Sequence, residues 1–524
     1  MKTSKTDITI IGGGLAGLSL AYQLTRNNPE LSIVVIERNN FPIPNTTAKV
    51  GESTVEIASH YFTHTLGLGE HFKESHLVKH GLRCFFGTPQ NDFSQQDELG
   101  VSRLFGVPSY QLDRGVTENH LHKLITERGV RVIDGATTDC LELGNQKQSI
   151  KVSNDNICEK IESRWLIDAA GRQKLLSKKL GLHKDSEHKG NAVWFRVNRR
   201  VIIDDWSDNP EWHDRIESKG SRWLSTNHLT GPGYWVWVIP LGTGTTSFGI
   251  VMDDQAFEEA NINSFEDALK WLRANQPKCA QSLEGAEVMD FCQLRDYSYG
   301  CKKMFSNEGW CLTGEAAAFT DPFYSPGSDF IAINNTFINE LISAQSKGKD
   351  IRADSYAFHL FYDSFFQSTL SLYTHEYGGF GDRRMMGVKL LWDYSYYWGV
   401  LALIFFKQTF VNIKLFASLN SLLDEARQLN TLVQNHLIER AKKRIVLPAE
   451  GIFLNQRLIP CLGEFVETLQ QSDTVDIHPT LDKNVQTLRR LSRYITNMLQ
   501  DSPTSAISED EQSLLGDYRK LIVA

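Results

Sequence analysis

The sequence predicts an α/β fold, α+β overall, with a Rossmann-like domain, an antiparallel sheet and a large α-helical C-terminal region. Three observations predict it. A strand, a glycine-rich turn and a helix open the chain, alternating apolar strands lie near its middle, and helical periodicity replaces the strand signals from Ile331 onward. With 524 residues, the chain has room for two or three domains. We expect a discontinuous nucleotide-binding domain at 1–185 with 290–340, a sheet domain at 186–289 and a helical domain at 341–524.

The composition limits the partners and the location. With 41% hydrophobic and 23% charged residues, it is ordinary for a globular protein. The net charge of -8 and the lack of a Lys/Arg block disfavour nucleic acid and anionic lipid. The polar lead before Ile8 has no features of a secretory signal, so we expect a cytoplasmic protein. The most apolar window, Trp398–Phe406, is too short for a membrane-spanning helix, so we expect no integral membrane segment. It predicts a buried helix, and a helix that lines a groove or lies at an interface is the alternative. Eight scattered cysteines form no CxxC pair and predict no metal site.

The first strand and helix carry a dinucleotide fingerprint. Gly12, Gly14 and Gly17 follow an apolar strand and open a helical pattern, and Glu37 ends the next apolar strand. The glycines allow a tight turn and bring backbone N–H groups towards a pyrophosphate, while a carboxylate at the position of Glu37 meets a ribose hydroxyl. The spacing therefore predicts a bound dinucleotide, either NAD or FAD.

Three later segments decide between these dinucleotides. LIDAAGRQ (166–173), WCLTGEAAAFTDP (310–322) and YQLDRGVTENHLHKLI, which begins at Tyr110, resemble segments of the flavoprotein family typified by aromatic hydroxylases. The resemblance implies FAD, with a late strand and the following helix against the ribityl chain and the flavin ring. It assigns cofactor contacts to Arg114, Asp168, Gly171, Gly314 and Glu315. At Glu315 the family usually has an aspartate.

A more specific resemblance rests on three motifs. KVGEST (49–54), LVKHGLRCFFG (77–87) and the WxWxIP motif of residues 235–240 are similar to motifs of the flavin-dependent halogenases. The strands WVWVIPL and TTSFGIV are expected to form a hairpin of an antiparallel sheet. In the halogenases WxWxIP lies beside the tunnel between flavin and substrate. The match extends the expected cofactor contacts to Arg38, Gly51, Glu52, Ser53, Asp321 and Gly327.

Lys79, Trp235 and Trp237 are the catalytic candidates that this resemblance implies. In the halogenases a lysine at the matching position lies at the far end of the tunnel, where it holds or is chlorinated by hypohalous acid. A buried lysine could equally orient a hydroxylating intermediate or act as an acid. The residues alone leave two simpler interpretations open, a solvated surface lysine and tryptophans that only pack a sheet.

The stretch GEAAAFTDPFYSPGSDF (314–330) departs from the halogenases at two positions. Those enzymes place Ser-Ser-Gly or Ser-Thr-Gly after their Asp-Pro and hold a halide with backbone N–H groups, whereas Pro326 has no N–H. Tyr324 replaces the acidic residue that tryptophan halogenases direct at the substrate ring nitrogen. Free tryptophan is therefore not the expected substrate, and Tyr324 becomes a further catalytic candidate. Oxygenation needs no halide and is favoured over halogenation.

The expected function is oxygenation of an electron-rich aromatic group by an FAD-dependent oxidoreductase that uses reduced flavin and O2, through a flavin C4a-hydroperoxide. The large helical region is similar in plan to that of halogenase-like flavoproteins that mature the cysteine tryptophylquinone of bacterial amino-acid oxidases. That resemblance implies a tryptophan residue of a partner protein as the substrate. No second GxGxxG is present in the sequence, so we expect a separate flavin reductase or another electron donor.

Two alternative functions stay open. The first is a flavin-dependent halogenase of a phenol or a pyrrole, with the substrate free or tethered to a carrier protein. The second is a catalytically silent, FAD-binding chaperone that only binds its partner protein. Lys79 and the WxWxIP motif count against the chaperone, because a silent protein has no need of them.

Overall fold

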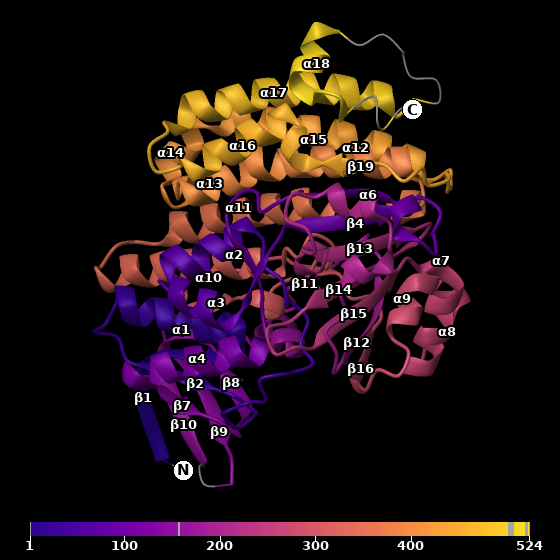
Figure 1. The fold of residues 1–524 in the computed structure, drawn as a ribbon. Helices are drawn as coiled ribbons and strands as arrows, with labels where there is room; N and C mark the ends of the chain where they lie inside the picture. The colour runs from indigo at the N-terminus through magenta and orange to yellow at the C-terminus, as the bar shows by residue number, and fades with distance from the viewer. Residues whose placement is uncertain (1, 156–157, 501–507, 519–521, 523–524) are drawn as a thin grey trace. The chain divides into compact units, whose positions relative to one another are not determined.

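The computed structural model describes residues 2–155, 158–500, 508–518 and 522 (Figure 1). The chain forms two compact units. Unit 1 contains residues 1–75, 112–186 and 298–366, and unit 2 contains residues 76–111, 187–297 and 367–524. The three-domain division expected from the sequence stays a prediction.

Unit 1 contains a mostly parallel sheet. Its strands are β1 (Lys2–Ile11), β2 (Ile33–Ile36), β7 (Arg131–Ile133), β8 (Thr137–Glu142), β9 (Gln148–Ser153), β10 (Cys158–Asp168) and β18 (Trp310–Leu312). They follow the order β7-β2-β1-β10-β9-β8, with β18 paired to β10. The pairings of β1 with β2 and β10, of β2 with β7 and of β10 with β18 are parallel, while β8 and β9 add antiparallel. This sheet confirms the Rossmann-like fold predicted from the sequence.

Unit 1 also contains α-helices. They are α1 (Leu15–Asn27), α2 (Glu56–His60), α3 (Gly69–Ser75), α4 (Arg114–Glu127), α5 (Leu175–Lys179), α10 (Gly327–Ser346) and the first part of α11 (Arg352–Leu370). Helix α1 packs against both α4 and α10. Strands β11 (His183–Asp185) and β17 (Tyr299–Cys301) form a separate pair. Because Ile11 and Leu312 are both in register with Asp168, the carboxyl ends of β1, β10 and β18 meet at one edge, where α/β sheets bind ligands.

Unit 2 contains an eight-stranded, mostly antiparallel sheet. Its strands are β4 (Leu82–Phe86), β5 (Asp97–Gly100), β12 (Asn191–Val197), β13 (Thr226–Gly231), β14 (Tyr234–Pro240), β15 (Thr246–Met252), β16 (Val288–Leu294) and β19 (Phe453–Asn455). They follow the order β16-β12-β15-β14-β13-β4-β5-β19. β14 and β15 confirm the predicted hairpin of the WxWxIP motif. β3 (Leu77–Lys79) and β6 (Ser109–Gln111) form a separate antiparallel pair.

One face of this sheet forms an apolar core. Phe195, Val236 and Phe248 lie on it together with Phe257 and Leu272, which come from the helices that cover the face. These helices are α7 (Asp254–Ala260), α8 (Phe265–Asn275) and α9 (Pro277–Ser282), and α6 (Pro210–Asp214) precedes them in the chain. Alternation along the strands directs the intervening side chains to the opposite face.

The C-terminal part of unit 2 is helical, orange to yellow in Figure 1. Its helices are α12 (Arg383–Tyr396), α13 (Leu403–Phe406), α14 (Ile413–Ser418), α15 (Asn420–Ala441), α16 (Pro460–Gln470), α17 (Ile477–Met498) and α18 (Glu509–Leu515). Helices α12, α15 and α17 pack against one another. One apolar stripe of α17 is fully buried and consists of Val485, Leu488, Leu491, Ile495 and Met498. The apolar window Trp398–Phe406 is buried except for the half-buried Leu401.

Candidate functional site

The turn between β1 and α1 has room for a ligand beside Gly14. Gly12 has a φ of +110°, and a Cβ there would lie 2.2 Å from the carbonyl oxygen of Ala169. A Cβ on Gly17 would lie 2.0 Å from the carbonyl oxygen of Gly12, so the fold itself requires both glycines. A Cβ on Gly14, by contrast, would meet no atom within 4 Å. The first N–H groups of α1 therefore face space that an anion can occupy.

Glu37 and Arg38 follow β2 beside this turn. Glu37 Oε2 accepts the backbone N–H of Gly13 at 2.7 Å, and Oε1 accepts the backbone and side-chain N–H groups of Asn39 at 2.9 and 2.7 Å. A carboxylate offers about four acceptor sites, so Glu37 can still accept a ribose hydroxyl. The Arg38 side chain is exposed at the surface of unit 1.

The segment 49–54 folds over Arg114 at the start of α4. Arg114 donates to the carbonyl oxygen of Val50 at 2.5 Å and to Glu118 Oε1 at 2.8 Å. Glu118 is fully buried and also pairs with Lys49. Within the described part of the chain, the buried Nε–H of Arg114 has no acceptor. Because an unmade hydrogen bond from a buried charged group is costly, a ligand is the natural acceptor at this point.

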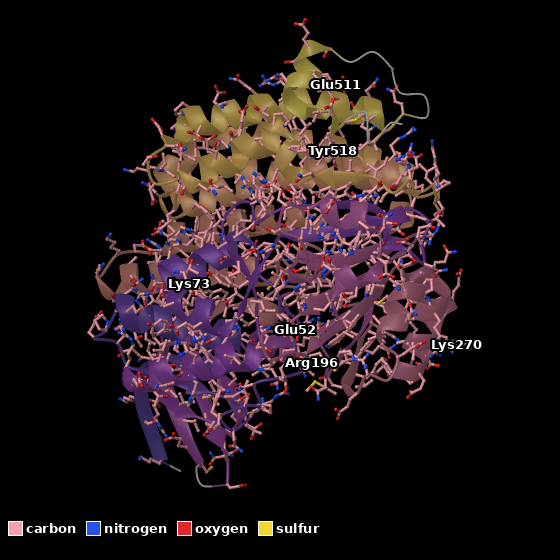
Figure 2. The ribbon with its side chains drawn as sticks, in the orientation of Figure 1. Glu52, Lys73, Arg196, Lys270, Glu511 and Tyr518 are labelled. Atoms are coloured by element: carbon pink, nitrogen blue, oxygen red, sulfur yellow. The ribbon has the colours of Figure 1, made fainter. Side chains whose placement is uncertain are left out.

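Gly51, Glu52 and Ser53 complete this loop. A Cβ on Gly51, whose φ is +93°, would lie 2.9 Å from Nη1 of Arg114. Glu52, labelled in Figure 2, accepts the N–H of Leu112 through its carbonyl oxygen at 2.6 Å. The side chains of Glu52 and Ser53 are buried. The loop and α4 therefore form one connected wall beside α1.

Asp168 and Gly171 lie after the carboxyl end of β10. Asp168 is fully buried, and its carboxylate accepts the N–H groups of Ala170 at 3.0 Å and Leu176 at 2.7 Å. Burial raises the pKa of Asp168, and these backbone hydrogen bonds oppose the rise. The carboxylate therefore shapes the turn through Gly171, which has a φ of +58°.

Gly314, Glu315 and Asp321 lie beyond β18. A Cβ on Gly314 would lie 2.9 Å from Cβ of Ala16 in α1, so the glycine permits a close approach. Asp321 is buried and accepts the N–H of Phe323 at 2.8 Å. Glu315 lies 3.0 Å from Nε of Arg172. If a ribityl chain contacts Glu315 as expected, it would therefore share the Glu315 carboxylate with Arg172.

The chain bends abruptly before α10. Tyr324 and Ser325 have successive positive φ values of 68° and 61°, which residues other than glycine seldom adopt. The carbonyl oxygen of Pro326 then accepts the N–H groups of Asp329 and Phe330 at 3.0 and 3.2 Å. Pro326 thus occupies the capping position of α10 without an N–H of its own.

The start of α10 is open to a ligand. The N–H groups of Gly327 and Ser328 lie in the first turn, where the helix offers them no acceptor. A Cβ on Gly327 would meet no atom within 4 Å. Open space at Gly14 and Gly327, together with the Nε–H of Arg114, fits an extended dinucleotide such as FAD.

In unit 2, Lys79 is a buried residue. Its side chain is 1% exposed, and it lies in β3 opposite Ser109 of β6. The structure therefore excludes a solvated surface lysine. Burial, and secondarily the charge of Lys79, lowers the pKa of His228 to about 3. His228 is consequently a neutral neighbour of Lys79 at ordinary pH.

Strand register brings Trp237, His228 and Trp194 to one face of the sheet. Trp237 lies opposite His228 of β13 and Gly249 of β15, and Gly249 lies opposite Trp194 of β12. Residues directly opposite each other project to the same face. The Trp237 ring covers Gly249, since a Cβ there would lie 2.2 Å from it. Nε1 of Trp237 donates to Oγ of Ser247 at 3.2 Å.

Trp235 belongs to the same face. Its ring lies 5.7 Å from that of Trp237 and 5.3 Å from that of His228. Nε1 of Trp235 donates to the hydroxyl oxygen of Tyr377 at 2.8 Å. Both tryptophans of the WxWxIP motif are thus held at fixed positions, which fits either the packing or the substrate interpretation.

We expect Gly249→Ala to displace the ring of Trp237. The added methyl group has no space, and overpacking of this kind lowers the free energy of unfolding by about 1 to 3 kcal/mol. Denaturant unfolding followed by tryptophan fluorescence measures both effects. Gly463→Ala is the control, because a Cβ there would meet no atom within 4 Å. Unchanged stability and fluorescence in Gly249→Ala would show that Trp237 does not rest on the backbone at this point.

Three residues near the motif were not predicted from the sequence. They are His228, Trp194 and Tyr377. The turn Gly231–Gly233 between two apolar runs is a hairpin signal that could have placed His228 across from the motif. Trp194 and Tyr377 lie far from the motif in sequence, and no local pattern indicates their position.

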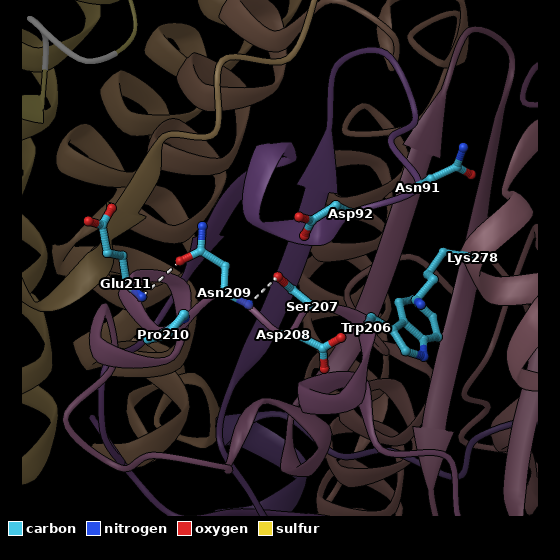
Figure 3. A pocket seen from close by; sticks show the side chains of 9 residues that line it. All are labelled: Asn91, Asp92, Trp206, Ser207, Asp208, Asn209, Pro210, Glu211 and Lys278. Atoms are coloured by element: carbon cyan, nitrogen blue, oxygen red, sulfur yellow. Dashed lines mark hydrogen bonds between the residues drawn. The ribbon is translucent and has the colours of Figure 1, made fainter.

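A hollow of about 800 Å³ in unit 2 contains none of the predicted residues (Figure 3). It is lined mainly by polar side chains between Trp206 and Glu211, with Asn91, Asp92 and Lys278. The described residues include no group of three or more His, Cys, Asp or Glu side chains that could hold a metal ion. In the same residues, no helix has the length and apolarity required to span a membrane.

The fold and the glycine turn define a protein with a Rossmann-like nucleotide-binding unit, and residues 10–95 match the NAD(P)-binding Rossmann-like domain. Residues 90–363, just over half of the chain, match the tryptophan halogenase family. The chain belongs to this family.

Curated relatives include further halogenases. The flavin-dependent halogenase chlA of Dictyostelium discoideum is 29% identical over 371 residues, which cover 64% of this chain and 60% of chlA. The chain thus matches less than two thirds of that relative. A 1H-pyrrole-2-carbonyl-[peptidyl-carrier protein] chlorinase of Pseudomonas fluorescens is 27% identical over 63% of this chain and 74% of its own length.

Solved structures share the fold. Halogenase PltM, in complex with phloroglucinol and FAD, matches with a TM-score of 0.67 and 16% identity over 98% of both chains. The flavin-dependent brominase Bmp2 matches with a TM-score of 0.57 and 22% identity over 71% of this chain and 87% of its own. At these identities the likeness establishes the fold alone.

Proposed function

We propose that the protein is an FAD-dependent oxidoreductase that uses reduced flavin and O2 to oxygenate an electron-rich aromatic group. Membership of the tryptophan halogenase family supports flavin chemistry. The FAD bound to PltM, which shares the fold over nearly its whole length, supports FAD as the cofactor. We favour oxygenation over halogenation because of one observation, the position of Pro326, which has no N–H, at the cap of α10.

The residues of unit 1 would hold this cofactor. When bound, FAD supplies the two electrons that activate O2. The N–H groups that follow Gly14 would hold the pyrophosphate, Glu37 would accept a ribose hydroxyl, and Arg114 would donate its Nε–H. Gly12 and Gly17 make the turn possible. The other proposed contacts are Arg38, Gly51, Glu52, Ser53, Asp168, Gly171, Gly314, Glu315, Asp321 and Gly327.

Four residues are proposed to handle the substrate. Trp235 and Trp237, which are 1% and 4% exposed, would form an aromatic wall behind the substrate ring. Lys79 is a buried cation or proton donor beside the neutral His228. Tyr324 presents a phenol where tryptophan halogenases have an acid, which disfavours free tryptophan as the substrate.

Pro326 disfavours halide binding. A halide beside the flavin must replace its hydration with N–H donors, and position 326 contributes none. A missing hydrogen bond to a charged group costs about 1.5 to 3 kcal/mol, roughly ten- to a hundredfold in affinity. Oxygenation has no such requirement and is unaffected by the proline.

The substrate that we favour is a tryptophan residue of a partner protein, oxygenated during maturation of a quinone cofactor. The departure at Tyr324 supports a substrate other than free tryptophan. The helical region of unit 2 fits a small arene as well as a partner protein, because halogenase PltM, in complex with phloroglucinol, matches this chain over 98% of both lengths. Electrons would come from a separate flavin reductase or another donor.

Halogenation of a pyrrole or a phenol is the second candidate. It is favoured by the relatives, among them enzymes named as a chlorinase and a brominase of 1H-pyrrole-2-carbonyl-[peptidyl-carrier protein]. A carrier-tethered substrate would also be a large partner. The two candidates differ in whether halide is used.

The test supplies reduced flavin from a separate reductase, O2, bromide and phenol, pyrrole or indole probes. We expect O2 consumption with little or no brominated product, because Pro326 removes a halide donor. Pro326→Thr restores the N–H, and the φ of -78° at this position suits threonine. This variant is expected to brominate roughly tenfold more than the wild type.

Efficient bromination by the wild-type protein would overturn the order of the two candidates and promote the halogenase. A protein that binds FAD, consumes no O2 beyond the free flavin and modifies nothing would instead be the silent chaperone. Equal bromination by the wild type and Pro326→Thr would show that position 326 is not a halide donor.

A further inference from the structure

Tyr377 accepts the indole N–H of Trp235 at 2.8 Å, although it lies outside every motif of the sequence. It begins a 3₁₀ turn, Tyr377–Gly379. The side chains of Trp235 and Tyr377 are 1% and 3% exposed. Away from water, loss of this hydrogen bond would leave a buried N–H without its acceptor, so the bond fixes the orientation of the indole.

The turn that carries Tyr377 is fastened to the hairpin that carries Trp235. The carbonyl oxygen of Tyr377 accepts the N–H of Gly233, between β13 and β14, at 2.8 Å. A Cβ on Gly381 would lie 2.9 Å from Cδ of Pro232. The two turns are therefore in direct backbone contact. This contact fixes the positions of the two residues whose side chains form the hydrogen bond, Trp235 and Tyr377.

The same turn is packed against the C-terminal helices. A Cβ on Gly379 would lie 2.1 Å from Sδ of Met385 in α12. A Cβ on Gly378 would lie 2.7 Å from the carbonyl oxygen of Ala441 at the end of α15. Any side chain at these positions would collide with α12 or α15. The two glycines therefore allow the turn to pack directly against these helices.

A buried ionic cluster holds the residue before Tyr377. Nζ of Lys389, on α12, lies 2.7 Å from Glu376 and 2.8 Å from Asp393. It also donates to the carbonyl oxygen of Leu372 at 2.6 Å. The three charged side chains are at most 1% exposed. Burial raises the pKa of Glu376 to about 8 against the opposing charge of Lys389. Separating these side chains would leave buried polar groups without partners, so the segment before Tyr377 is tied to α12.

We propose that Tyr377 is a positioning residue through which the C-terminal helices set the orientation of Trp235 against the aromatic substrate. The inference rests on the proposed function, which places the aromatic substrate beside the WxWxIP motif. The rings of His228 and Trp237 lie 5.3 and 5.7 Å from the indole. With Tyr377 as its acceptor, the indole has one hydrogen bond and two aromatic neighbours.

Tyr377→Phe removes only the acceptor oxygen. We expect KM for the aromatic substrate to rise roughly tenfold and product per O2 consumed to fall, with FAD content unchanged. Tyr234→Phe is the matched control, because Tyr234 lies next to Trp235 on β14 and also loses only a hydroxyl group. The Tyr234 hydroxyl contacts Gln276 at 3.0 Å and Asn275 at 3.3 Å on the core face. This control should keep the wild-type KM.

Trp235→Phe completes a double-mutant cycle. If Tyr377 acts through Trp235, adding Tyr377→Phe to Trp235→Phe should raise KM no further. An additive rise, or an unchanged KM in Tyr377→Phe alone, would overturn the inference.

A spectroscopic readout separates this inference from the proposed function. Ultraviolet resonance Raman spectra report the hydrogen bonding of indole N–H groups. Tyr377→Phe should shift one tryptophan signal, which is assigned to Trp235 by its loss in Trp235→Phe. If the shift is present but the wild type modifies no aromatic probe or partner, the proposed function fails while the contact stands. If no shift occurs, the inference itself fails.

Discussion

Gly14→Val is expected to give a folded protein that contains no FAD. A Cβ on Gly14 would meet no protein atom within 4 Å, and its φ of -84° and ψ of -173° suit a β-branched residue. The protein alone therefore tolerates valine. The bound pyrophosphate is expected to approach the N-terminus of α1 at this point, and the two methyl groups would exclude it. Flavin absorbance per protein after purification measures the loss.

Two further variants sharpen this experiment. Gly463→Val adds the same side chain at another open position, in α16, and should retain wild-type FAD. Gly327→Val adds it at the open start of α10 and should weaken FAD binding, because that helix is proposed to face the flavin. Circular dichroism and thermal unfolding verify that all three variants are folded. Normal flavin content in Gly14→Val would remove the basis of the nucleotide site.

The nucleotide-binding residues proposed in unit 1 could be predicted because their signals are close together in sequence. Gly12, Gly14 and Gly17 fall between one strand and one helix, and Glu37 ends the next strand. The reason for Gly17 is itself local, because its Cβ would strike the carbonyl oxygen of Gly12. A pattern of this kind survives almost any tertiary context.

The aromatic cluster of unit 2 could be predicted only in part. The hairpin that carries Trp235 follows from alternation along the chain, but Tyr377 reaches Trp235 from 142 positions away. β19, at residues 453–455, joins the sheet in parallel with β5, and no short-range signal indicates that pairing. Lysine is ordinarily an exposed residue, so the burial of Lys79 depends on a strand pairing that composition does not reveal.

The bend before α10 could be predicted from the sequence in one respect and not in another. The missing N–H of Pro326 follows from the residue type alone. The left-handed backbone of Tyr324 and Ser325 does not, because neither residue favours it. Surrounding structure must impose such a conformation, and strained segments of this kind concentrate at functional sites.

Lys79→Ala is expected to keep FAD and to lose most of the product. Coexpression with a candidate partner protein, followed by mass spectrometry, should show a gain of oxygen on one partner tryptophan with the wild type. A buried side chain that supplies or holds a proton contributes on the order of a hundredfold to rate, so the variant should show little of that gain. Lys79 belongs to unit 2 and the nucleotide turn to unit 1, so FAD binding should not depend on it.

Lys79→Met separates charge from packing in this prediction. Methionine retains most of the buried apolar volume but no ammonium, whereas alanine also leaves a cavity. We expect both variants to lose product, because the charge and its proton are what the proposed reaction uses. Product from Lys79→Met but not from Lys79→Ala would show that Lys79 acts only by packing and that its charge is not needed. If the wild type modifies only free small arenes and never a partner tryptophan, the protein substrate is wrong, and a small-molecule monooxygenase or halogenase takes its place.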